Sequence, residues 1–244
     1  MALAPFQDAD FEALLTLMHD ETEGWELAGD GEVKVWRRPD KKNKALIVMR
    51  AAVTVKDVDP EDLMAVWRDI EYRFSWDDRC AKNLCHSVLG EDPALQNEVG
   101  YYEGKAPPPL SNRDFVLQSG WRMRWRGERK WLYMNRSIEH PEFPEVKGVV
   151  RGISFVTGVH IEQTEDGLVT ITYVTNGDVG GWIPKPVTNW VVTKAGKKKP
   201  GCICCCHSHV LLFVAAPGLM TQMVKAAREY KAWKASKPEQ QTAT

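Results

Sequence analysis

Residues 71–77 read Glu71-Tyr72-Arg73-Phe74-Ser75-Trp76-Asp77, a stretch that combines charge with aromatic bulk where a surface helix is usually plainer. If these residues are helical, Arg73 and Asp77 stand four positions apart on one face and form an ion pair. A solvent-exposed pair of this kind contributes almost nothing to stability. A pair inside an apolar cavity would instead offer a guanidinium to an anion such as phosphate, and a carboxylate to a cation. The rest of the chain has to decide between these interpretations.

The residues before this stretch predict a helix that leads into it. Asp59-Pro60-Glu61-Asp62 is a strong helix start, because it supplies an N-cap, a proline at the first helical position and acids in the first turn. The apolar residues that then line one side of the helix are Leu63, Val66, Trp67 and Ile70. Such a helix would deliver Arg73 and Asp77 at or just beyond its end.

The remaining elements form a simple pattern. An amphipathic helix is predicted over residues 8–21, and a second one from Pro217-Gly218 to about Ser236. The strand-like segments lie at residues 25–27, 32–38, 44–55, 99–103, 113–125, 130–138, 149–163 and 168–175. Because strands and helices do not alternate, we predict an α+β fold in which a curved antiparallel sheet wraps around the long C-terminal helix.

Length and composition narrow the class of protein. The 244 residues suit one large domain, which we place at residues 1–238, with a disordered tail at residues 239–244. A net charge of -1 favours neither nucleic acid nor acidic partners. The N-terminus lacks the layout of a signal peptide, and no apolar run approaches the roughly 18 residues of a spanning helix. We therefore expect a cytoplasmic protein that meets membranes only transiently.

Several motifs carry a resemblance to a known family. They are Tyr72-Arg73-Phe74-Ser75-Trp76-Asp77, Val99-Gly100-Tyr101-Tyr102, Leu110-Ser111-Asn112-Arg113-Asp114-Phe115 and Gly177-Asp178-Val179-Gly180-Gly181-Trp182-Ile183-Pro184-Lys185. In this order and spacing, over about residues 20–236, the chain resembles a START domain, the helix-grip fold of intracellular lipid-transfer proteins. Met134-Asn135-Arg136-Ser137-Ile138-Glu139-His140-Pro141 and Val149-Val150-Arg151 narrow the resemblance toward the phosphatidylcholine-transfer subgroup.

This resemblance implies a binding site. It assigns the lipid phosphate to Arg73 and makes Asp77 the charge partner of that arginine. It also implies an aromatic cage for the quaternary ammonium, made by Tyr102, Phe115 and Phe155. The family pattern has Trp and Tyr where this chain has Tyr and Phe, so ring faces are kept while hydroxyls are lost at two of the three positions. We therefore expect phosphatidylethanolamine, as well as phosphatidylcholine, to be a ligand.

The function implied is that of a monomeric carrier, which holds one phospholipid in an internal tunnel between the sheet and the final helix. We expect no chemistry, no cofactor and no metal. A hydrolase of lipid or acyl esters is the alternative from the enzyme class, but the sequence contains no G-x-S-x-G elbow, no H-E-x-x-H and no phosphate loop of the G-x-x-x-x-G-K type. A lipid sensor or scaffold with the same pocket is a further alternative.

The final helix has two interpretations. Its Met223, Lys225, Arg228 and Lys231 suit a gate that rests on an anionic membrane. A structural helix with solvated basic residues would look the same.

The Cys-rich segment at residues 195–215 is an apparent insertion, because the family usually continues almost directly into the final helix. Its cysteines, Cys202, Cys204, Cys205 and Cys206, lie beside His207 and His209. A metal site would need ligands from a second segment, and acylation would anchor the chain to a membrane. We favour a mobile insertion that neither folding nor transfer requires.

Overall fold

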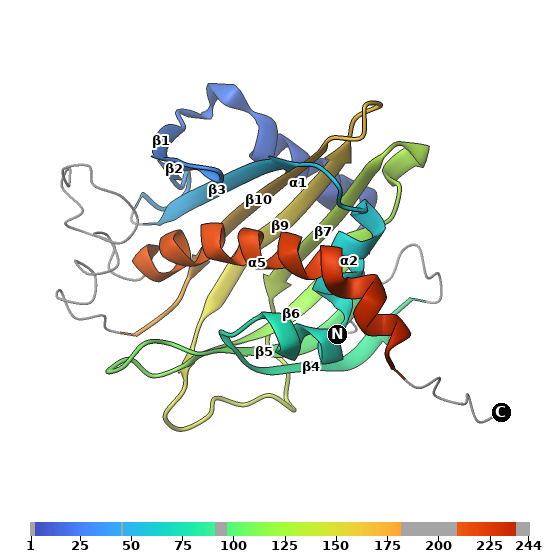
Figure 1. Cartoon of the computed structure of the whole chain (residues 1–244). Coiled ribbons are helices and arrows are strands. Elements are labelled where there is room, and N and C mark those ends of the chain that lie inside the picture. Colours follow the sequence, from blue (N-terminus) through green and yellow to red (C-terminus); the bar gives the residue numbers. More distant parts are fainter. Residues whose placement is uncertain (1–2, 45, 91–96, 182–208, 238–244) are drawn as a thin grey trace.

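The computed structural model describes residues 3–44, 46–90, 97–181 and 209–237 (Figure 1). Its helices are α1 (Asp8–His19), α2 (Pro60–Arg68), α3 (Ile70–Trp76) and α5 (His209–Ala235), with short 3-10 turns at Glu21–Glu23 and Trp125–Gly127. Its strands are β1 (Glu26–Asp30), β2 (Lys34–Pro39), β3 (Ile47–Val55), β4 (Cys80–Leu89), β5 (Asn97–Gly104), β6 (Arg113–Arg122), β7 (Lys130–Ser137), β8 (Val150–Arg151), β9 (Ile153–Gln163) and β10 (Val169–Asp178).

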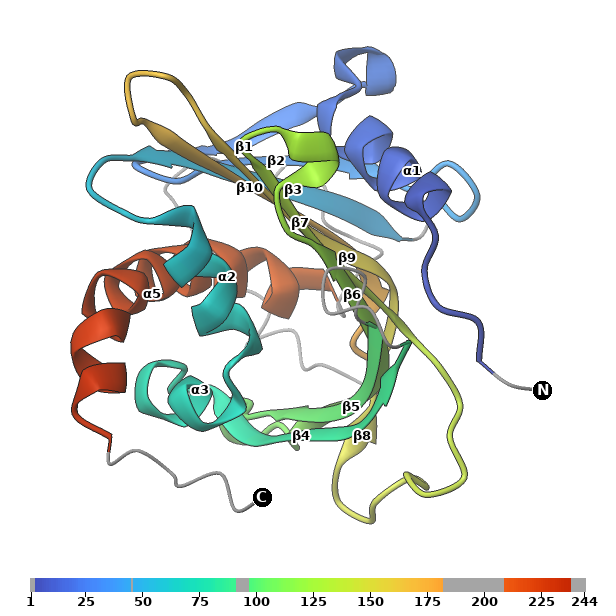
Figure 2. The same ribbon diagram turned by 90° about the vertical axis from the view of Figure 1, so that its right-hand side faces the viewer.

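The strands form one ten-stranded sheet with the order β1-β2-β3-β10-β9-β7-β6-β5-β4. Every pair along this path is antiparallel, and the short β8 pairs in parallel with β6. The sheet curves so that α2, α3 and α5 lie on its concave side, while α1 lies on the other side (Figure 2). The predicted α+β, helix-grip architecture is therefore confirmed.

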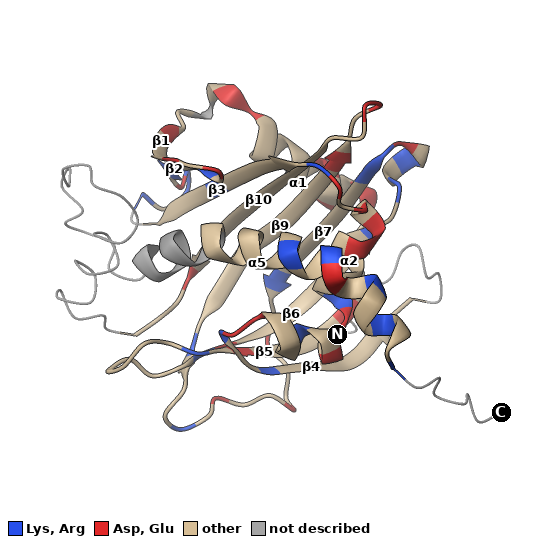
Figure 3. Ribbon diagram, in the orientation of Figure 1, with Lys and Arg blue, Asp and Glu red and all other residues tan. Residues whose placement is uncertain are grey.

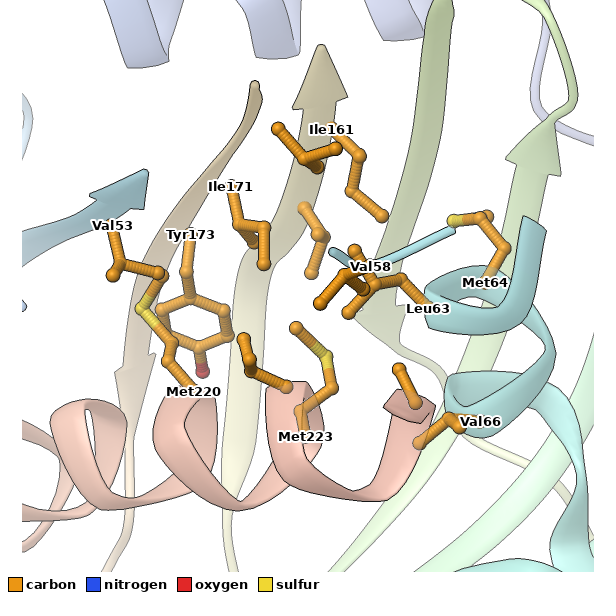
Figure 4. Close-up of a cluster of buried hydrophobic side chains, with 14 of the residues drawn as sticks. Val53, Val58, Leu63, Met64, Val66, Ile161, Ile171, Tyr173, Met220 and Met223 are labelled. Carbon is orange, nitrogen blue, oxygen red and sulfur yellow. The ribbon is translucent and has the colours of Figure 1, made fainter. Parts of the chain in front are cut away.

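Alternation along the strands gives the sheet two buried faces. In β7, Trp131 and Tyr133 belong to the core that contains α5, whereas Leu132 and Met134 belong to the core beneath α1. Side chains that are two positions apart share a face, so one strand serves both layers. Figure 4 shows Met220 and Met223 of α5 directed at side chains of the sheet such as Ile171.

A break between α2 and α3 at Asp69 determines the position of residues 71–77. Asp69 ends α2 and caps α3, because its Oδ1 accepts a hydrogen bond from the Tyr72 amide at 2.9 Å. The Tyr72 hydroxyl donates to the Ala226 carbonyl at 2.9 Å, and the Tyr230 hydroxyl donates to Asp69 Oδ2 at 3.0 Å. The short helix α3 is thus fastened to α5.

Three elements differ from the sequence prediction. β4 was missed, because its burial alternates weakly along an edge strand that begins Cys80-Ala81-Lys82-Asn83. The single strand predicted at residues 149–163 is two strands, β8 and β9. The final helix begins at His209 rather than Pro217, so residues 209–215 of the apparent insertion are helical. Residues 195–208 and the tail 239–244 lie outside the described residues. Among the described helices, none combines the length and the apolarity needed to cross a membrane.

A histidine pair joins α1 to the sheet. His19 Nε2 lies 2.9 Å from His160 Nδ1 on β9, and His160 is 4% exposed. Burial, together with the neighbouring His19, lowers the pKa of His160 to about 4, and burial also lowers the pKa of His19. The folded protein therefore resists protonation of this pair.

We expect the melting temperature to fall as the pH is lowered from 7 to 5. The unfolded chain takes up a proton at His160 near pH 6.5, whereas the folded chain does so only near pH 4, so stability is full above about pH 6.5 and declines below it. Calorimetry across this range tests the expectation. His160→Asn should flatten the dependence, and an unchanged slope in this variant would contradict it.

Candidate ligand-binding cavity

A cavity of about 700 Å³ lies on the concave side of the sheet. It is lined by residues of α2, α3, β4, β5, β6, β7, β9 and β10, and by Leu219 of α5. The space between α5 and the β3, β10 and β9 strands is filled by core side chains instead (Figure 4). In the described part of the chain, the cavity therefore lies mainly toward the α2, α3 and β4–β6 side of the concave face, and it reaches the final helix at Leu219. The volume of this cavity falls in the range that is usual for small-molecule binding sites.

The ion pair predicted in the stretch 71–77 is present. Arg73 Nε donates to Asp77 Oδ2 at 2.8 Å, and the two residues are 8% and 1% exposed. Burial disfavours the charge on Arg73, but the nearby Asp77 carboxylate overcomes this and raises the pKa of the arginine. The pair is therefore buried at the cavity wall and not a solvated surface pair. Arg79, which also lines the cavity, places its Nε 3.8 Å from the other Asp77 oxygen.

Aromatic rings enclose the Arg73 guanidinium. Its Cζ lies 4.9 Å from the ring centroid of Trp67, 4.8 Å from that of Trp76 and 5.5 Å from that of Tyr102. The Tyr102 hydroxyl also approaches Asp77 Oδ2 at 3.4 Å, and burial followed by the Asp77 charge raises the pKa of this phenol. Ring faces attract cations, so these contacts hold Arg73 in place while leaving the cavity side of Tyr102 accessible.

Two of the three predicted cage residues lie together. Tyr102 and Phe115 are directly paired across β5 and β6, and both line the cavity. Side chains that face each other across strands are close enough to act on one ligand group. The cage role of these two rings stays a prediction.

The third predicted cage residue is misplaced. Phe155 is 47% exposed and does not line the cavity. The reason is a bulge, because β10 pairs Asn176 with Val156 and Gly177 with Ser154, which leaves Phe155 without a partner. Its neighbour Ser154 faces the cavity instead. Gly177 permits this close approach, since a Cβ there would lie 2.7 Å from the Ile153 carbonyl oxygen.

A band of polar side chains crosses the cavity wall. It consists of six buried residues on β6, β7, β9 and β10: Ser119, Tyr133, Asn135, Ser154, Thr157 and Thr175. They are linked in one chain of hydrogen bonds with lengths of 2.8–3.1 Å. The wall is therefore not uniformly apolar, and the band offers hydroxyl and amide groups to a polar part of a ligand.

The predicted gate residues of α5 occupy different environments. Met223 is 2% exposed within the core, which corrects its assignment to a membrane surface. Lys231 pairs with Asp59 at 2.7 Å and with Asp62 at 3.2 Å, and Arg228 donates to the Lys56 carbonyl at 3.0 Å. Lys225 is exposed, and basic residues are visible along the C-terminal half of α5 (Figure 3). The membrane role of these cations stays a prediction.

Comparison with known proteins assigns the family. The START domain model matches residues 6–196. The chain belongs to the START domain family. It is 30% identical over 228 residues to START domain-containing protein 10 of mouse and of human, covering 93% of this chain and 69% of each relative. It is 26% identical over 211 residues to bovine phosphatidylcholine transfer protein, covering 85% of each chain.

Solved structures agree with this assignment. The crystal structure of human STARD10 superposes with a TM-score of 0.75 at 31% identity, covering 96% of this chain and 84% of that chain. Human StAR-related lipid transfer protein 5 has the same fold, with a TM-score of 0.65 at 18% identity, covering 92% of this chain and 95% of that one. The START fold of the chain is thus supported by sequence and by structure.

Sequence reasoning missed the polar band of this START domain. Its members are common strand residues, and only the pairing of four strands brings them together. Sequence reasoning also quoted Arg113 only as part of a motif, although it is 6% exposed and lines the cavity. A signal was available, because Arg113 and Phe115 are two positions apart in a predicted strand and so share a face. No group of three metal-binding side chains occurs in the described part of the chain, and Cys202–Cys206 lie outside it.

We expect Asp77→Ala to destabilise this START domain by about 3–5 kcal/mol, because it leaves the Arg73 charge buried without a partner. Urea denaturation measures the change. The matched control is Arg37→Gln, which removes an exposed pair with Glu26 and should cost less than about 1 kcal/mol. A loss at Asp77→Ala as small as that of the control would show that the couple is not electrostatically buried.

Proposed function

We propose that the protein is a carrier that binds a single phospholipid, most readily phosphatidylcholine, and moves it between membranes. The observation that carries the proposal is the cavity, which joins a neutral buried ion pair and two aromatic rings to a largely apolar interior. Family membership supports it, since one relative is named for phosphatidylcholine transfer. The unit of transfer is one chain in the cytoplasm, which touches membranes only during exchange.

The acyl tails supply most of the affinity. Each methylene taken out of water contributes roughly 0.8 kcal/mol, and a diacyl lipid carries dozens of them. A cation–π contact contributes only about 0.5–2 kcal/mol. The rings of Tyr102 and Phe115 therefore select the headgroup. Phe115 lacks a hydroxyl, which leaves phosphatidylethanolamine as a second ligand, and the polar band suits the ester groups between headgroup and tails.

The carrier performs no reaction on its ligand in this proposal. Among the described residues, the groups around the Arg73–Asp77 pair are Arg79 and aromatic rings. None of these is arranged as a nucleophile with an adjacent base, which hydrolysis of an ester requires. The lipid is therefore released as it was taken up.

Phe115→Leu should lower the affinity for phosphatidylcholine roughly 2- to 30-fold, because it replaces a ring face with an aliphatic group of lower cation affinity. The assay is transfer of fluorescent phosphatidylcholine between vesicles, combined with equilibrium binding. Phe155→Leu is the matched control, since that ring lies outside the cavity, and it should behave like the wild type. Equal losses in both variants would remove Phe115 from the headgroup site.

We place membrane contact on the exposed basic side of α5. Lys225→Glu should weaken co-sedimentation with vesicles rich in phosphatidylserine by roughly 5- to 30-fold, since each basic residue near an anionic surface contributes about 1 kcal/mol. Lys147→Glu, an equal charge change on the exposed loop between β7 and β8, should have little effect. Binding that is lost equally in both variants would show attraction by net charge alone.

A further inference from the structure

Five polar side chains form one row across the concave face of the sheet. Strand pairing joins Glu98 to Ser119, Ser119 to Asn135, Asn135 to Thr157, and Thr157 to Thr175. All five residues line the cavity. The last four belong to the polar band, so Glu98 extends this band onto β5 and adds a carboxyl group to it.

Hydrogen bonds in one half of the polar band run in a single direction. The Ser154 hydroxyl has one proton and donates it to Asn135 Oδ1 at 3.0 Å. The 3.1 Å contact between Ser154 and Thr157 is therefore donated by Thr157. In the same way, the 2.8 Å contact between Thr157 and Thr175 is donated by Thr175. Both threonine protons are thus used within the band.

The other half of the band has unused donors. Asn135 Nδ2 carries two protons, and one of them goes to the Tyr133 hydroxyl at 3.1 Å. Tyr133 and Ser119 have one hydroxyl proton each but share a single hydrogen bond of 3.0 Å. One amide proton and one hydroxyl proton therefore lack an acceptor in the described part of the chain, although the three residues are only 5–7% exposed. A buried donor without an acceptor costs free energy, which a ligand oxygen would recover.

Glu98 supplies the complementary acceptor. Its hydrogen-bond partner among the described residues is the Cys85 thiol, a weak donor at 3.7 Å. Burial raises the pKa of Glu98, and the thiol and the nearby charge of Arg68 on α2 offset only part of this effect. An ester carbonyl can only accept hydrogen bonds, whereas a hydroxyl can accept from Ser119 or Asn135 and also donate to Glu98. The row therefore suits a hydroxyl group of a ligand.

Distance along the strands places this hydroxyl at the glycerol part of the ligand. Glu98 and Ser119 each lie four residues from the paired rings of Tyr102 and Phe115, on the same strands, which corresponds to roughly 13 Å. An extended chain of about ten covalent bonds spans such a distance. The ammonium of a choline headgroup is separated from the glycerol oxygens by a chain of similar length. Between Glu98 and Tyr102 on this face of β5 stands only Gly100, which has no side chain to obstruct the ligand.

We propose that the cavity also takes lysophospholipids, and that Glu98 accepts a hydrogen bond from their free glycerol hydroxyl while Ser119 and Asn135 donate to glycerol oxygens. A lysophospholipid has a single acyl chain, so one of its two ester positions is a hydroxyl. A diacyl lipid has no hydroxyl there and leaves the Glu98 carboxyl with the thiol as its donor. This inference rests on the proposed carrier function and adds a class of ligand to it.

The experiment compares lysophosphatidylcholine with its 2-O-methyl ether, in which a methyl group replaces the hydroxyl proton. Both compete with fluorescent phosphatidylcholine for the full chain, at concentrations below micelle formation. The wild type should bind the lysolipid roughly 10- to 100-fold more tightly than the ether, as expected for a hydrogen bond to a carboxylate. Glu98→Ala should reduce this ratio to near one, and Glu98→Gln, whose amide oxygen still accepts, should keep roughly 2- to 10-fold. Glu165→Ala, in an exposed turn outside the cavity, should keep the wild-type ratio.

The outcomes separate this inference from the carrier function. Thermal melting of each variant checks that it is folded. Wild-type protein that binds neither phosphatidylcholine nor the lysolipid contradicts the carrier function itself. Wild-type protein that binds phosphatidylcholine but does not distinguish the lysolipid from its ether overturns the hydroxyl site and leaves the carrier function standing. A wild-type ratio that persists in Glu98→Ala likewise removes Glu98 from the site.

Discussion

Arg73 and Asp77 can remain charged in a nearly water-free position because the guanidinium and the carboxylate pair with each other, with Arg79 Nε a further 3.8 Å from Asp77. The local structure serves this pairing. Asp69 caps α3, and the resulting turn of helix places the two side chains one above the other at a distance of 2.8 Å. Trp67, Trp76 and Tyr102 then exclude water around the guanidinium. Once the pair is neutral, the cavity beside it can hold a ligand with both charges without a large electrostatic penalty.

The concave face of the sheet is divided between a core and a cavity. Met220 and Met223 of α5 pack onto the central strands and fill that half, while Tyr230 packs against Tyr72 of α3. On the β4–β6 side, α2 and α3 enclose a cavity of about 700 Å³ together with the strands. The division explains how one sheet both stabilises the domain and holds a ligand. The same division places α3 at the boundary between the core and the cavity. Its Tyr72 donates a hydrogen bond to α5, while its Arg73 lines the cavity.

Much of this arrangement could be predicted from the sequence, because spacing along one element encodes it. The ion pair follows from a spacing of four positions in a helix. The helix that carries it, α3, is capped by Asp69, whereas the predicted start at Asp59 begins α2. Features that depend on contacts between distant strands could not be predicted. The bulge that turns Phe155 outward arises from the pairing of β9 with β10, and the polar band needs four strands in register. Arg113 was quoted as a motif residue, but its burial at the cavity wall becomes visible only once the strands are paired.

The central claim is that the cavity holds one intact phospholipid. Native mass spectrometry of the full chain after incubation with phosphatidylcholine vesicles tests it most directly, with the bound molecule released and weighed separately. The account predicts a complex of one chain and one lipid whose mass equals that of the unmodified phospholipid. Recovery of only free protein, or of a lysophospholipid and a fatty acid, would contradict it.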